Sequence, residues 1–416
     1  MIMRTRPTGT PDRLGILGGG QLARMLAEAA RRQGVTPVVL AGSPDDPAAG
    51  LGVDVIVGTL DDPSALSALM SRVDVVTPEN EFLDLDRLDQ ALAQHPTVDL
   101  RPGRAALAVA QDKLAQKRMF AHLDVATAPA VPVAAASLAA DLQQAAARFP
   151  DGFVLKWSRF GYDGRGNLMV RHLSEATLAR ARRFCERGER AGAAVFAEQR
   201  IDFATELAMV ATRGADGDLA TFPLVRSRQE GGICRETVGP AVALGCDPHL
   251  EAQAGAVLAA VGRHLDFCGT FAVEFFLDRH GTLLANEMAP RVHNTGHYTL
   301  FDDEPSQFDL HVQAVTARPL ARPAVHGLAL MRNLLGPPDV APDTPCPPPT
   351  AVAPTGTRLT WYGKATASPG RKLGHLTGRA TSPAQARELQ AAMQAYERQL
   401  WHDRRTQERR EPRHAR

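Results

Sequence analysis

Two glutamates, Glu274 and Glu287, stand on consecutive apolar stretches at a spacing that suits a divalent cation. Residues 271–277 and 282–288 are rich in strand-forming side chains, and the sequence DRHG between them predicts a β-hairpin. With the turn centred there, we expect Glu274 to pair opposite Ala285 and Glu287 to lie diagonally beyond it, roughly 7–8 Å away on the same face. Carboxylates that leave room for phosphate oxygens suit one or two Mg²⁺ ions. The alternative is that both face solvent on an edge hairpin.

Residues that could contact phosphate groups lie near this hairpin and in an earlier glycine-rich segment. Asn286 and Arg291 supply an amide and a fixed cation beside Glu287. GFVLKW at 152–157 predicts a buried strand that carries Lys156 toward SRFGYDGRGN at 158–167, a loop whose amides can close over phosphates. The pattern GxxxxGK[ST] is absent, so this is no Walker A loop, and a plain mobile hairpin turn is the alternative.

Further polar residues stand where other predicted strands end. The strands 193–201 and 205–213 leave the sheet beside groups that suit an adenine and its ribose. These groups are Glu198, Gln199, Ile201 and Glu206. A predicted helix at 104–123 carries Lys113 and Lys117 four residues apart, which is also the ordinary spacing of a solvated face.

A basic cluster near the carboxyl end completes the candidate groups. Lys364, Arg371 and Lys372 suit a phosphate monoester, and a solvated basic turn is the alternative. They belong to a predicted small β unit at 358–378, which follows a proline-dense connector at 337–356.

The amino-terminal part has the pattern of a parallel sheet. It begins with a strand from Leu14, followed by the glycines at 18–20 and a helix that stops at Gly34. Strands follow at 36–41, 53–57 and 73–77, with a helix at 63–70 between the last two. The glycines fit a dinucleotide fingerprint, but Ala41-Gly42 stands where an NAD site needs an acid. We expect the helix amides after Gly20 to be able to hold one phosphate. TPENE at 77–81 ends the last strand, so Glu79 or Glu81 could face a substrate, although a solvated loop is the alternative.

Composition and charge limit the remaining possibilities. The 416 residues are 44% hydrophobic and 22% charged, with a net charge of +1, which predicts a globular protein without a general field for nucleic acid or membrane. Five scattered cysteines without a CxxC pair favour a reducing cytosol. We also expect a disordered leader at 1–12, a long polar loop at 221–240, helices at 248–265 and 308–320, and a final helix from Ala384 that gives way to an unstructured basic tail.

Taken in order, eight motifs identify a family. GGGQLARM, TPENE, QDKLAQK, VLKWSRFGYDGRGN, AEQRIDFATELA, GTFAVEFF, LLANEMAPRVHNTGH and WYGKATASPGRKLGH resemble the N5-carboxyaminoimidazole ribonucleotide synthases, an ATP-grasp family of purine biosynthesis, over nearly all of residues 13–400. The resemblance implies an α/β ATP-grasp fold. Its expected parts are a Rossmann-like domain at 13–110, a lid region at 111–200, a central domain with the metal site at 201–336, the connector at 337–356, a C-terminal β unit at 357–400 and a basic tail at 401–416.

The resemblance also implies the reaction and the roles of individual residues. Bicarbonate would be joined to the amine of 5-aminoimidazole ribonucleotide with ATP and Mg²⁺, through carboxyphosphate. The positions implied for ATP are Lys113, Lys156, Gly161, Tyr162, Asp163, Gly164, Arg165, Gly166, Glu198, Gln199, Arg200, Ile201, Glu206, Gln229, Asn286 and Glu287. Those implied for the ribonucleotide are Gly20, Gln21, Leu22, Glu81, Tyr162, Asp163, Arg165, His293, Asn294, Lys364, Arg371 and Lys372. Glu274 and Glu287 would hold the metal, and the catalytic candidates are Arg291, His293, Tyr162 and Arg165.

Three departures and two alternatives accompany the resemblance. The chain has TPENE where the family usually has TYEFE, Gln229 where a histidine is frequent, and Ala289 where many relatives have asparagine. A formate-dependent glycinamide ribonucleotide transformylase shares the grasp core but not WYGKATASPGRKLGH. A Rossmann-type nucleotide-binding protein without ligase activity would leave Glu274 and Glu287 without a role. A cytoplasmic homodimer is expected by family analogy, with no nucleic-acid or membrane partner.

Overall fold

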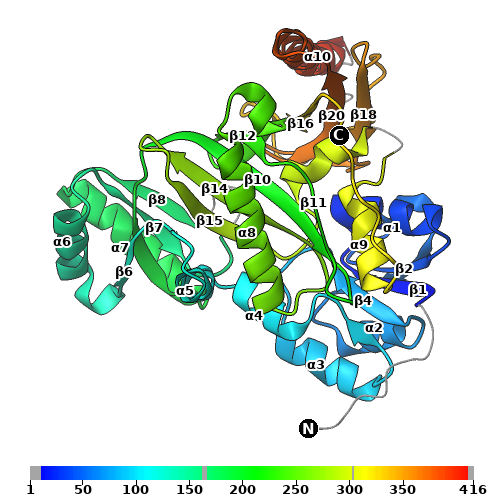
Figure 1. The fold of residues 1–416 in the computed structure, drawn as a ribbon, viewed down its shortest axis with the longest axis horizontal. Coiled ribbons are helices and arrows are strands. Elements are labelled where there is room, and N and C mark those ends of the chain that lie inside the picture. The colour runs from blue at the N-terminus through cyan, green and yellow to red at the C-terminus, as the bar shows by residue number, and fades with distance from the viewer. Residues whose placement is uncertain (1–10, 162–165, 302–303, 411–416) are drawn as a thin grey trace.

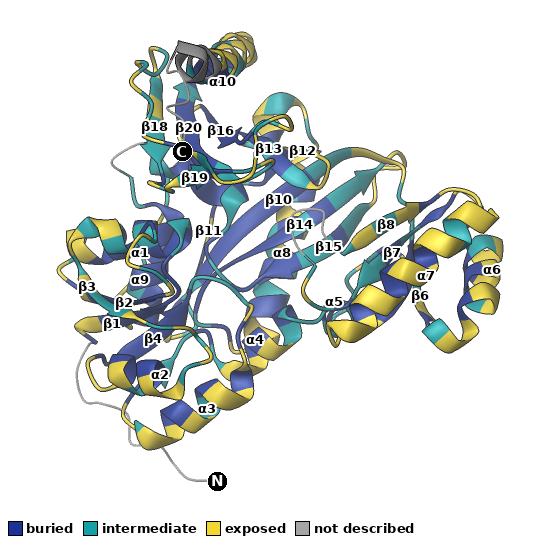
Figure 2. Cartoon of the chain, turned by 180° about the vertical axis from the view of Figure 1, so that it is seen from behind, coloured by how far each residue is buried: buried dark blue, intermediate teal, exposed yellow. Residues whose placement is uncertain are grey.

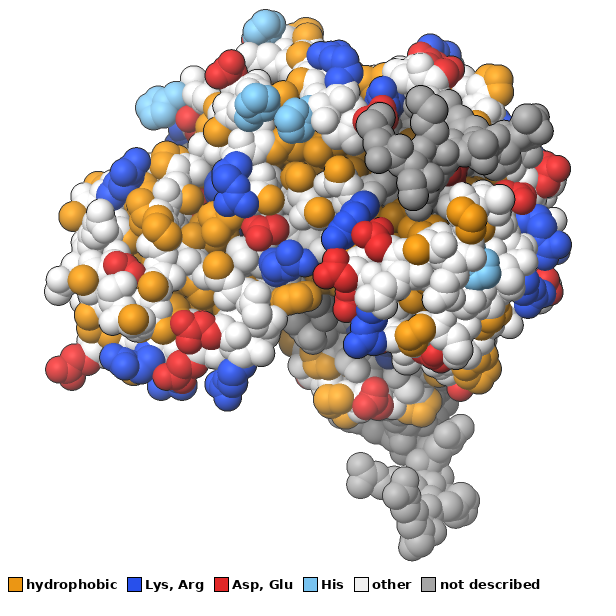
Figure 3. Space-filling model, turned by 90° about the horizontal axis from the view of Figure 1, so that it is seen from below, with side chains coloured by type: hydrophobic (Ala, Val, Ile, Leu, Met, Phe, Trp, Pro, Cys, Tyr) orange, Lys and Arg blue, Asp and Glu red, His pale blue; other side chains and the backbone are white. Residues whose placement is uncertain are grey.

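The computed structural model describes residues 11–161, 166–301 and 304–410, so the leader at residues 1–10 and the predicted loop residues Tyr162, Asp163, Gly164 and Arg165 lie outside it. The described residues form three large sheets with their helices (Figure 1) and one two-stranded sheet. Among the described residues, no helix is both long and apolar enough to cross a membrane. On the face drawn in Figure 3, acidic and basic side chains are interspersed, in keeping with the net charge of +1.

The amino-terminal sheet is parallel, as predicted, with the strand order β3-β2-β1-β4-β5. Its strands are β1 (Arg13–Leu17), β2 (Thr36–Ala41), β3 (Asp54–Val57), β4 (Val75–Pro78) and β5 (Asp99–Leu100). One face packs against α1 (Gln21–Arg32) and α9 (Gln307–Val315), and the other against α2 (Pro63–Met70) and α3 (Leu85–Gln94). Helix α9 comes from a distant part of the chain, so it fixes this sheet to the rest of the molecule.

The helix predicted at 104–123 is in fact two helices. α4 (Arg104–Ala110) ends before Gln111, and α5 (Lys113–His122) starts after Asp112. The Asp112 carboxylate accepts hydrogen bonds from the backbone N–H groups of Leu114 and Ala115 at 2.8 and 3.0 Å. Such a cap satisfies amides that have no partner within the helix, so the break is stabilised at this position.

A four-stranded antiparallel sheet forms a separate layer at one end of the molecule (Figure 1). Its order is β6-β9-β7-β8, from β6 (Ala130–Val133), β7 (Phe153–Trp157), β8 (Asn167–Val170) and β9 (Val195–Gln199). Helices α6 (Leu138–Arg148) and α7 (Glu175–Arg190) pack on it through a shared apolar cluster, and their outer faces are exposed (Figure 2).

A nine-stranded sheet forms the centre, in the order β15-β14-β10-β12-β13-β16-β20-β18, with β11 on β10. Its members are β10 (Phe203–Arg213), β11 (Leu219–Thr221), β12 (Val225–Glu230), β13 (Ile233–Gly239), β14 (Gly269–Asp278), β15 (Leu283–Ala289), β16 (Leu328–Leu335), β18 (Thr357–Trp361) and β20 (Lys372–Ala380). Helix α8 (Pro248–His264) and helix α5 pack on the half formed by β10, β14 and β15. Figure 2 shows β10 and β14 as largely buried strands.

The long polar loop predicted at 221–240 is wrong, because most of it forms the β12–β13 hairpin. Gly231 and Gly232 both have positive φ values, 61° and 81°, and make the tight turn. Across the hairpin, Arg228 donates to Glu236 at 3.1 Å. A cross-strand pair of opposite charges can stabilise a hairpin whose strands lack the apolar–polar alternation that identifies most strands. For this reason the sequence of this hairpin resembles a loop.

The β14–β15 hairpin is present, but its predicted register is wrong. Glu274 lies opposite Glu287, and Ala285 lies opposite Phe275. The Asp278 carboxylate accepts from two backbone N–H groups of the turn, and Leu277 pairs with Leu283 rather than with Thr282. The register then shifts once more, as Asn286 is an extra residue on β15. Together these two shifts make the glutamates direct cross-strand neighbours instead of diagonal ones.

The carboxyl-terminal part shares the central sheet. The predicted connector at 337–356 joins β16 to β18, and both of these strands pair with β20. Within it, β17 (Thr344–Pro345) pairs with β19 (Thr366–Ala367). Helix α10 (Pro383–Arg410) packs on β16 and β20 and continues through Arg410, so the prediction of an unstructured tail from residue 404 is wrong for residues 404–410.

Candidate active site

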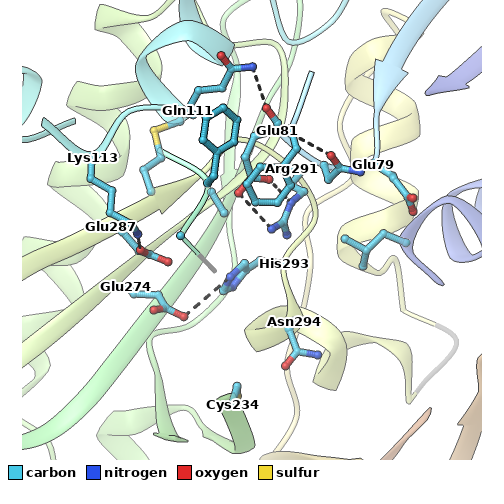
Figure 4. Close-up of a pocket in the computed structure, with 18 of the residues that line it drawn as sticks. Glu79, Glu81, Gln111, Lys113, Cys234, Glu274, Glu287, Arg291, His293 and Asn294 are labelled. Carbon is cyan, nitrogen blue, oxygen red and sulfur yellow. Dashed lines mark hydrogen bonds and ion pairs between the residues drawn. The ribbon is translucent and has the colours of Figure 1, made fainter. Parts of the chain in front are cut away.

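A cavity of about 370 Å³ lies where the amino-terminal sheet, the α4–α5 turn and the central sheet meet (Figure 4). Its lining includes predicted residues from every one of these parts. These are Gln21, Leu22, Glu81, Lys113, Gly161, Gln229, Glu274, Glu287, Arg291, His293, Asn294 and Lys372. The fold therefore brings together side chains that are up to 351 positions apart, from Gln21 to Lys372.

The two paired carboxylates form one wall. Lys113, the first residue of α5, makes an ion pair with Glu287. Gln229 on β12 donates to Glu274 at 3.4 Å, and the His293 Nε2 atom lies 3.9 Å from the other Glu274 oxygen. In Figure 4, Glu274 and Glu287 lie side by side between Lys113 and His293.

The two carboxylates have different proton affinities. Burial, together with the nearby charges of Glu287 and Glu206, raises the pKa of Glu274 to about 8. Burial would also raise the pKa of Glu287, but the charge and hydrogen bond of Lys113 outweigh it and hold this pKa below its usual value. One weak and one strong acid thus lie side by side, and a cation bound between them would favour the ionised form of both.

The donor set suits a metal that completes its coordination with other oxygens. Within residues 11–161, 166–301 and 304–410, no three His, Cys, Asp or Glu side chains are grouped so that they could hold a metal ion. Two carboxylates as direct cross-strand neighbours are what Mg²⁺ takes from a protein when phosphates and water supply the remaining ligands. The residues therefore fit a magnesium–nucleotide complex better than a closed structural metal site.

Next to this pair, two partly buried lysines and a buried glutamate form a cluster of charges. The Glu198 carboxylate, whose side chain is 4% exposed, makes ion pairs with Lys117 at 2.6 Å and with Lys156. Lys156 also donates to the Asn286 Oδ1 atom at 3.4 Å. Burial acts against ionisation of Glu198, but the two lysines hold its pKa below its usual value. Lys117, which by spacing alone resembled a solvated face, thus belongs to the site.

The predicted adenine segment is only partly available to a ligand. The Glu198 side chain is engaged with lysines, and Gln199 donates its backbone N–H to the Pro129 carbonyl at 2.8 Å. Arg200 donates its side chain to the Asp151 carbonyl at 3.0 Å. Glu206 lies on β10 opposite Phe276, so it shares a sheet face with Glu274, and burial raises its pKa. None of these four residues lines the cavity.

The structure separates the two glutamates of TPENE. Glu79 accepts hydrogen bonds from the backbone N–H groups of Gly20 and Ala23 at 2.8 and 3.0 Å. Its carboxylate occupies these two amides at the start of α1, so a phosphate there would have to use the amides of Gln21 and Leu22, and its binding stays a prediction. Glu81 instead accepts from Arg291 at 2.7 Å, and both glutamates line the cavity.

His293 and its neighbour are held in place by polar partners. The His293 Nδ1 atom lies 2.8 Å from the Thr295 hydroxyl, and its backbone N–H donates to Gln307 at 2.8 Å. Burial lowers the pKa of His293 to about 3, assisted by the charges of Arg291 and Lys372, so its imidazole is neutral. Asn294 exchanges amide hydrogen bonds with Asn333.

The predicted basic cluster is divided between different surroundings. Lys372 lines the cavity, whereas Arg371 donates to the Thr366 carbonyl and hydroxyl at 3.0 and 2.8 Å. The Lys364 ammonium lies 5.9 Å from the centre of the Tyr362 ring. The lining also includes groups that the sequence left unassigned, notably Gln111, Gln116 and Cys234. Gln111 and Gln116 stand in the motif QDKLAQK, which gave no role to either of them, and none of the eight motifs contains Cys234.

Comparisons with known proteins agree with this arrangement. Residues 12–111 match the ribonucleotide synthetase preATP-grasp domain, residues 118–308 the ATP-grasp domain, and residues 329–389 the phosphoribosylaminoimidazole carboxylase C-terminal domain. The chain is 36% identical over 365 residues to an N5-carboxyaminoimidazole ribonucleotide synthase from Synechococcus elongatus, and the matched region covers 88% of each protein. It is 35% identical over 366 residues to a protein of the same name from Brucella melitensis, which covers 88% of this chain and 95% of the relative.

Solved structures give the same result. An N5-carboxyaminoimidazole ribonucleotide synthetase from Thermus thermophilus aligns with a TM-score of 0.78 and 35% identity over 91% of this chain and 97% of that one. A carboxyaminoimidazole ribonucleotide synthase from Aspergillus clavatus, complexed with ATP, aligns with a TM-score of 0.81 and 26% identity over 94% and 99%. A structure from the same organism with ADP and 5-aminoimidazole ribonucleotide aligns with a TM-score of 0.79 and 25% identity over 93% and 99%.

Proposed function

The chain belongs to the N5-carboxyaminoimidazole ribonucleotide synthases, a family of ATP-grasp ligases, and from this membership we propose how its cavity carries out their reaction. The enzyme converts 5-aminoimidazole ribonucleotide, ATP and bicarbonate into N5-carboxyaminoimidazole ribonucleotide in purine biosynthesis. The observation that carries the assignment of the site is the direct pairing of Glu274 with Glu287, opposite a wall that presents Glu81 and Arg291.

The chemistry requires two steps in one enclosed place. Bicarbonate is a poor electrophile, so its oxygen first attacks the γ-phosphorus of ATP, which releases ADP and forms carboxyphosphate. The exocyclic amine then attacks the carboxyl carbon, and phosphate leaves. Because carboxyphosphate hydrolyses readily, both substrates must be bound before the first step. The cavity has groups for each of them on facing walls.

On the nucleotide side, we assign cationic groups to the phosphates and carboxylates to the metal. Lys113 and Lys156 lie next to the carboxylate pair and can neutralise phosphate charge. Asn286, the extra residue of the β15 bulge, accepts a hydrogen bond from Lys156. Mg²⁺ would be held by Glu274 and Glu287 and would stabilise the charge that develops on the transferred phosphoryl group. Glu206 would accept hydrogen bonds from the ribose hydroxyls, and backbone groups at the end of β9 would contact the adenine.

On the ribonucleotide side, the cavity is lined by charged groups that include Lys372 and the Glu81–Arg291 pair. Lys372 would bind the substrate phosphate. Arg291 would orient carboxyphosphate toward the amine, with its guanidinium held in place by Glu81. His293 has a pKa of about 3, so it is too weak a base to take the amine proton efficiently and would act as a neutral hydrogen-bonding group.

We also propose Mg²⁺ as the metal, a cytoplasmic location and a homodimer. The magnesium proposal is supported by the hard oxygen ligands of the paired glutamates. Family membership supports both other proposals, and the scattered cysteines, which are typical of a reducing compartment, support the cytoplasmic location.

A steady-state assay of ADP release tests the function. Release that depends on both 5-aminoimidazole ribonucleotide and bicarbonate is expected. Dependence on formate and glycinamide ribonucleotide would instead identify the transformylase, whose C-terminal motif differs from this chain. If neither pair stimulates ADP release, the ligase assignment is wrong.

A further inference from the structure

Gln111, at the junction of α4 and α5, forms hydrogen bonds with the loop that carries Glu81. Its amide nitrogen donates to the backbone carbonyls of Glu81 at 2.8 Å and of Leu83 at 2.7 Å. Its amide oxygen accepts from the Arg159 guanidinium at 2.6 Å. Both amide protons and one oxygen lone pair are therefore used, which fixes the orientation of the amide. In Figure 4, this side chain lies beside the Glu81 segment, and a dashed line joins the two.

Two residues farther along the chain, the same junction contacts the cavity wall that Glu274 and Glu287 form. Lys113 makes its ion pair with Glu287, and its backbone N–H donates to the Ser158 carbonyl at 2.7 Å. Glu287 is four residues before Arg291, and Arg291 pairs with Glu81. The contacts thus form a closed ring around the cavity that runs through Glu81, Gln111, Lys113, Glu287 and Arg291.

We propose that Gln111 is a positioning residue that sets the distance between the two substrate walls. The inference rests on the proposed function, because it assigns one wall to the ribonucleotide and the other to the metal–nucleotide complex. Without the two donated hydrogen bonds, the Glu81 loop keeps its ion pair with Arg291 but loses its connection to the Lys113 helix. The amine would then be misplaced relative to carboxyphosphate, and a small misplacement of reacting atoms is costly in rate.

The first test replaces Gln111 with methionine, which has a similar shape and cannot donate. We expect the KM for the ribonucleotide to rise about tenfold, as for the loss of one to two hydrogen bonds, while the KM for ATP changes less than about twofold. We also expect more than one ADP to form for each N5-carboxyaminoimidazole ribonucleotide, since carboxyphosphate would hydrolyse before the amine captures it. This ratio does not depend on the fraction of folded enzyme, so a loss of stability alone would leave it unchanged.

Two further variants keep the inference falsifiable. Gln111→Glu retains an acceptor for Arg159 but places a carboxylate against two carbonyl oxygens, so it should uncouple the reaction at least as much as Gln111→Met. Gln90→Met makes the same substitution at an exposed position on α3 and should match wild type in both KM values and in the ratio.

The outcomes separate the inference from the function on which it rests. If wild-type enzyme releases no ADP with the ribonucleotide and bicarbonate, the proposed function fails. If wild type is active and the Gln111 variants keep an ADP-to-product ratio of about one, or raise both KM values equally, the positioning role of Gln111 is wrong while the function stands.

Discussion

Glu274 and Glu287 should respond in opposite directions to the same isosteric substitution. The structure raises the pKa of Glu274 to about 8 from an ordinary value of 4.5, and its side chain is only 14% exposed. Between those two pH values the folded protein holds a proton that the unfolded chain has lost. The folded state therefore becomes less stable as pH rises through this window.

The size of this effect follows from the shift. Each pH unit in the window is worth 1.36 kcal/mol, so three units, from pH 4.5 to 7.5, cost at most about 4 kcal/mol. Glu274→Gln removes the charge but leaves an amide that also needs partners, so we expect a gain in the free energy of unfolding of about 2 kcal/mol at pH 7.5. The gain should shrink at pH 5.5, where the window contributes only about 1.4 kcal/mol.

Glu287→Gln is the matched comparison on the facing strand. It leaves the Lys113 ammonium without its ion pair, and because the Glu287 side chain is 39% exposed, solvent should limit the loss to about 1 kcal/mol. Urea unfolding followed by tryptophan fluorescence at both pH values measures these differences, and ADP release measures activity. Both variants should be inactive. A destabilised Glu274→Gln protein at pH 7.5, shifts of equal sign, or wild-type turnover in either variant would refute the reasoning.

Three further predictions test other parts of the site. Lys372→Met should raise the KM for the ribonucleotide about tenfold and the KM for ATP less than about twofold, because it removes a charged contact to only one substrate. Arg371→Ala should change the two KM values in the same direction as Lys372→Met. If steady-state kinetics show equal changes in both KM values, these residues do not belong to the ribonucleotide site. Glu198→Gln should lower the free energy of unfolding by about 3 kcal/mol, because Lys117 and Lys156 lose a buried partner, and an unchanged urea midpoint would contradict this. The pH profile of kcat/KM should contain no ionisation from His293 between pH 5 and 9, and an acidic limb near pH 6.5 that disappears in His293→Asn would show that this imidazole titrates.

Much of the architecture was predictable from local patterns. The parallel amino-terminal sheet follows from alternating strand and helix patterns, and α2 begins and ends where the sequence predicted. The β12–β13 hairpin was missed because its charged residues satisfy one another across the strands, which a single-strand pattern does not reveal. The break at Asp112 was missed because a cap inside a continuous helical pattern competes with propagation of the helix.

The site itself was only partly predictable. Strand alternation placed Glu274 and Glu287 on one face, but their direct pairing depends on the turn geometry and on the extra residue Asn286. The separation of Glu79 from Glu81 depends on tertiary contacts, since one carboxylate caps α1 and the other meets Arg291 from a distant strand. Gln111 opens the motif QDKLAQK, but its role was not predictable, because its partners are backbone carbonyls of another segment.

The position of the bound metal tests the central claim most directly. Crystals grown with ADP and Mg²⁺ should show an ion with oxygen distances of about 2.1 Å to carboxylates of both Glu274 and Glu287, completed by oxygens of the nucleotide and water. An ion bound elsewhere, with the two carboxylates turned away from the nucleotide, would contradict the assignment of this hairpin as the metal site.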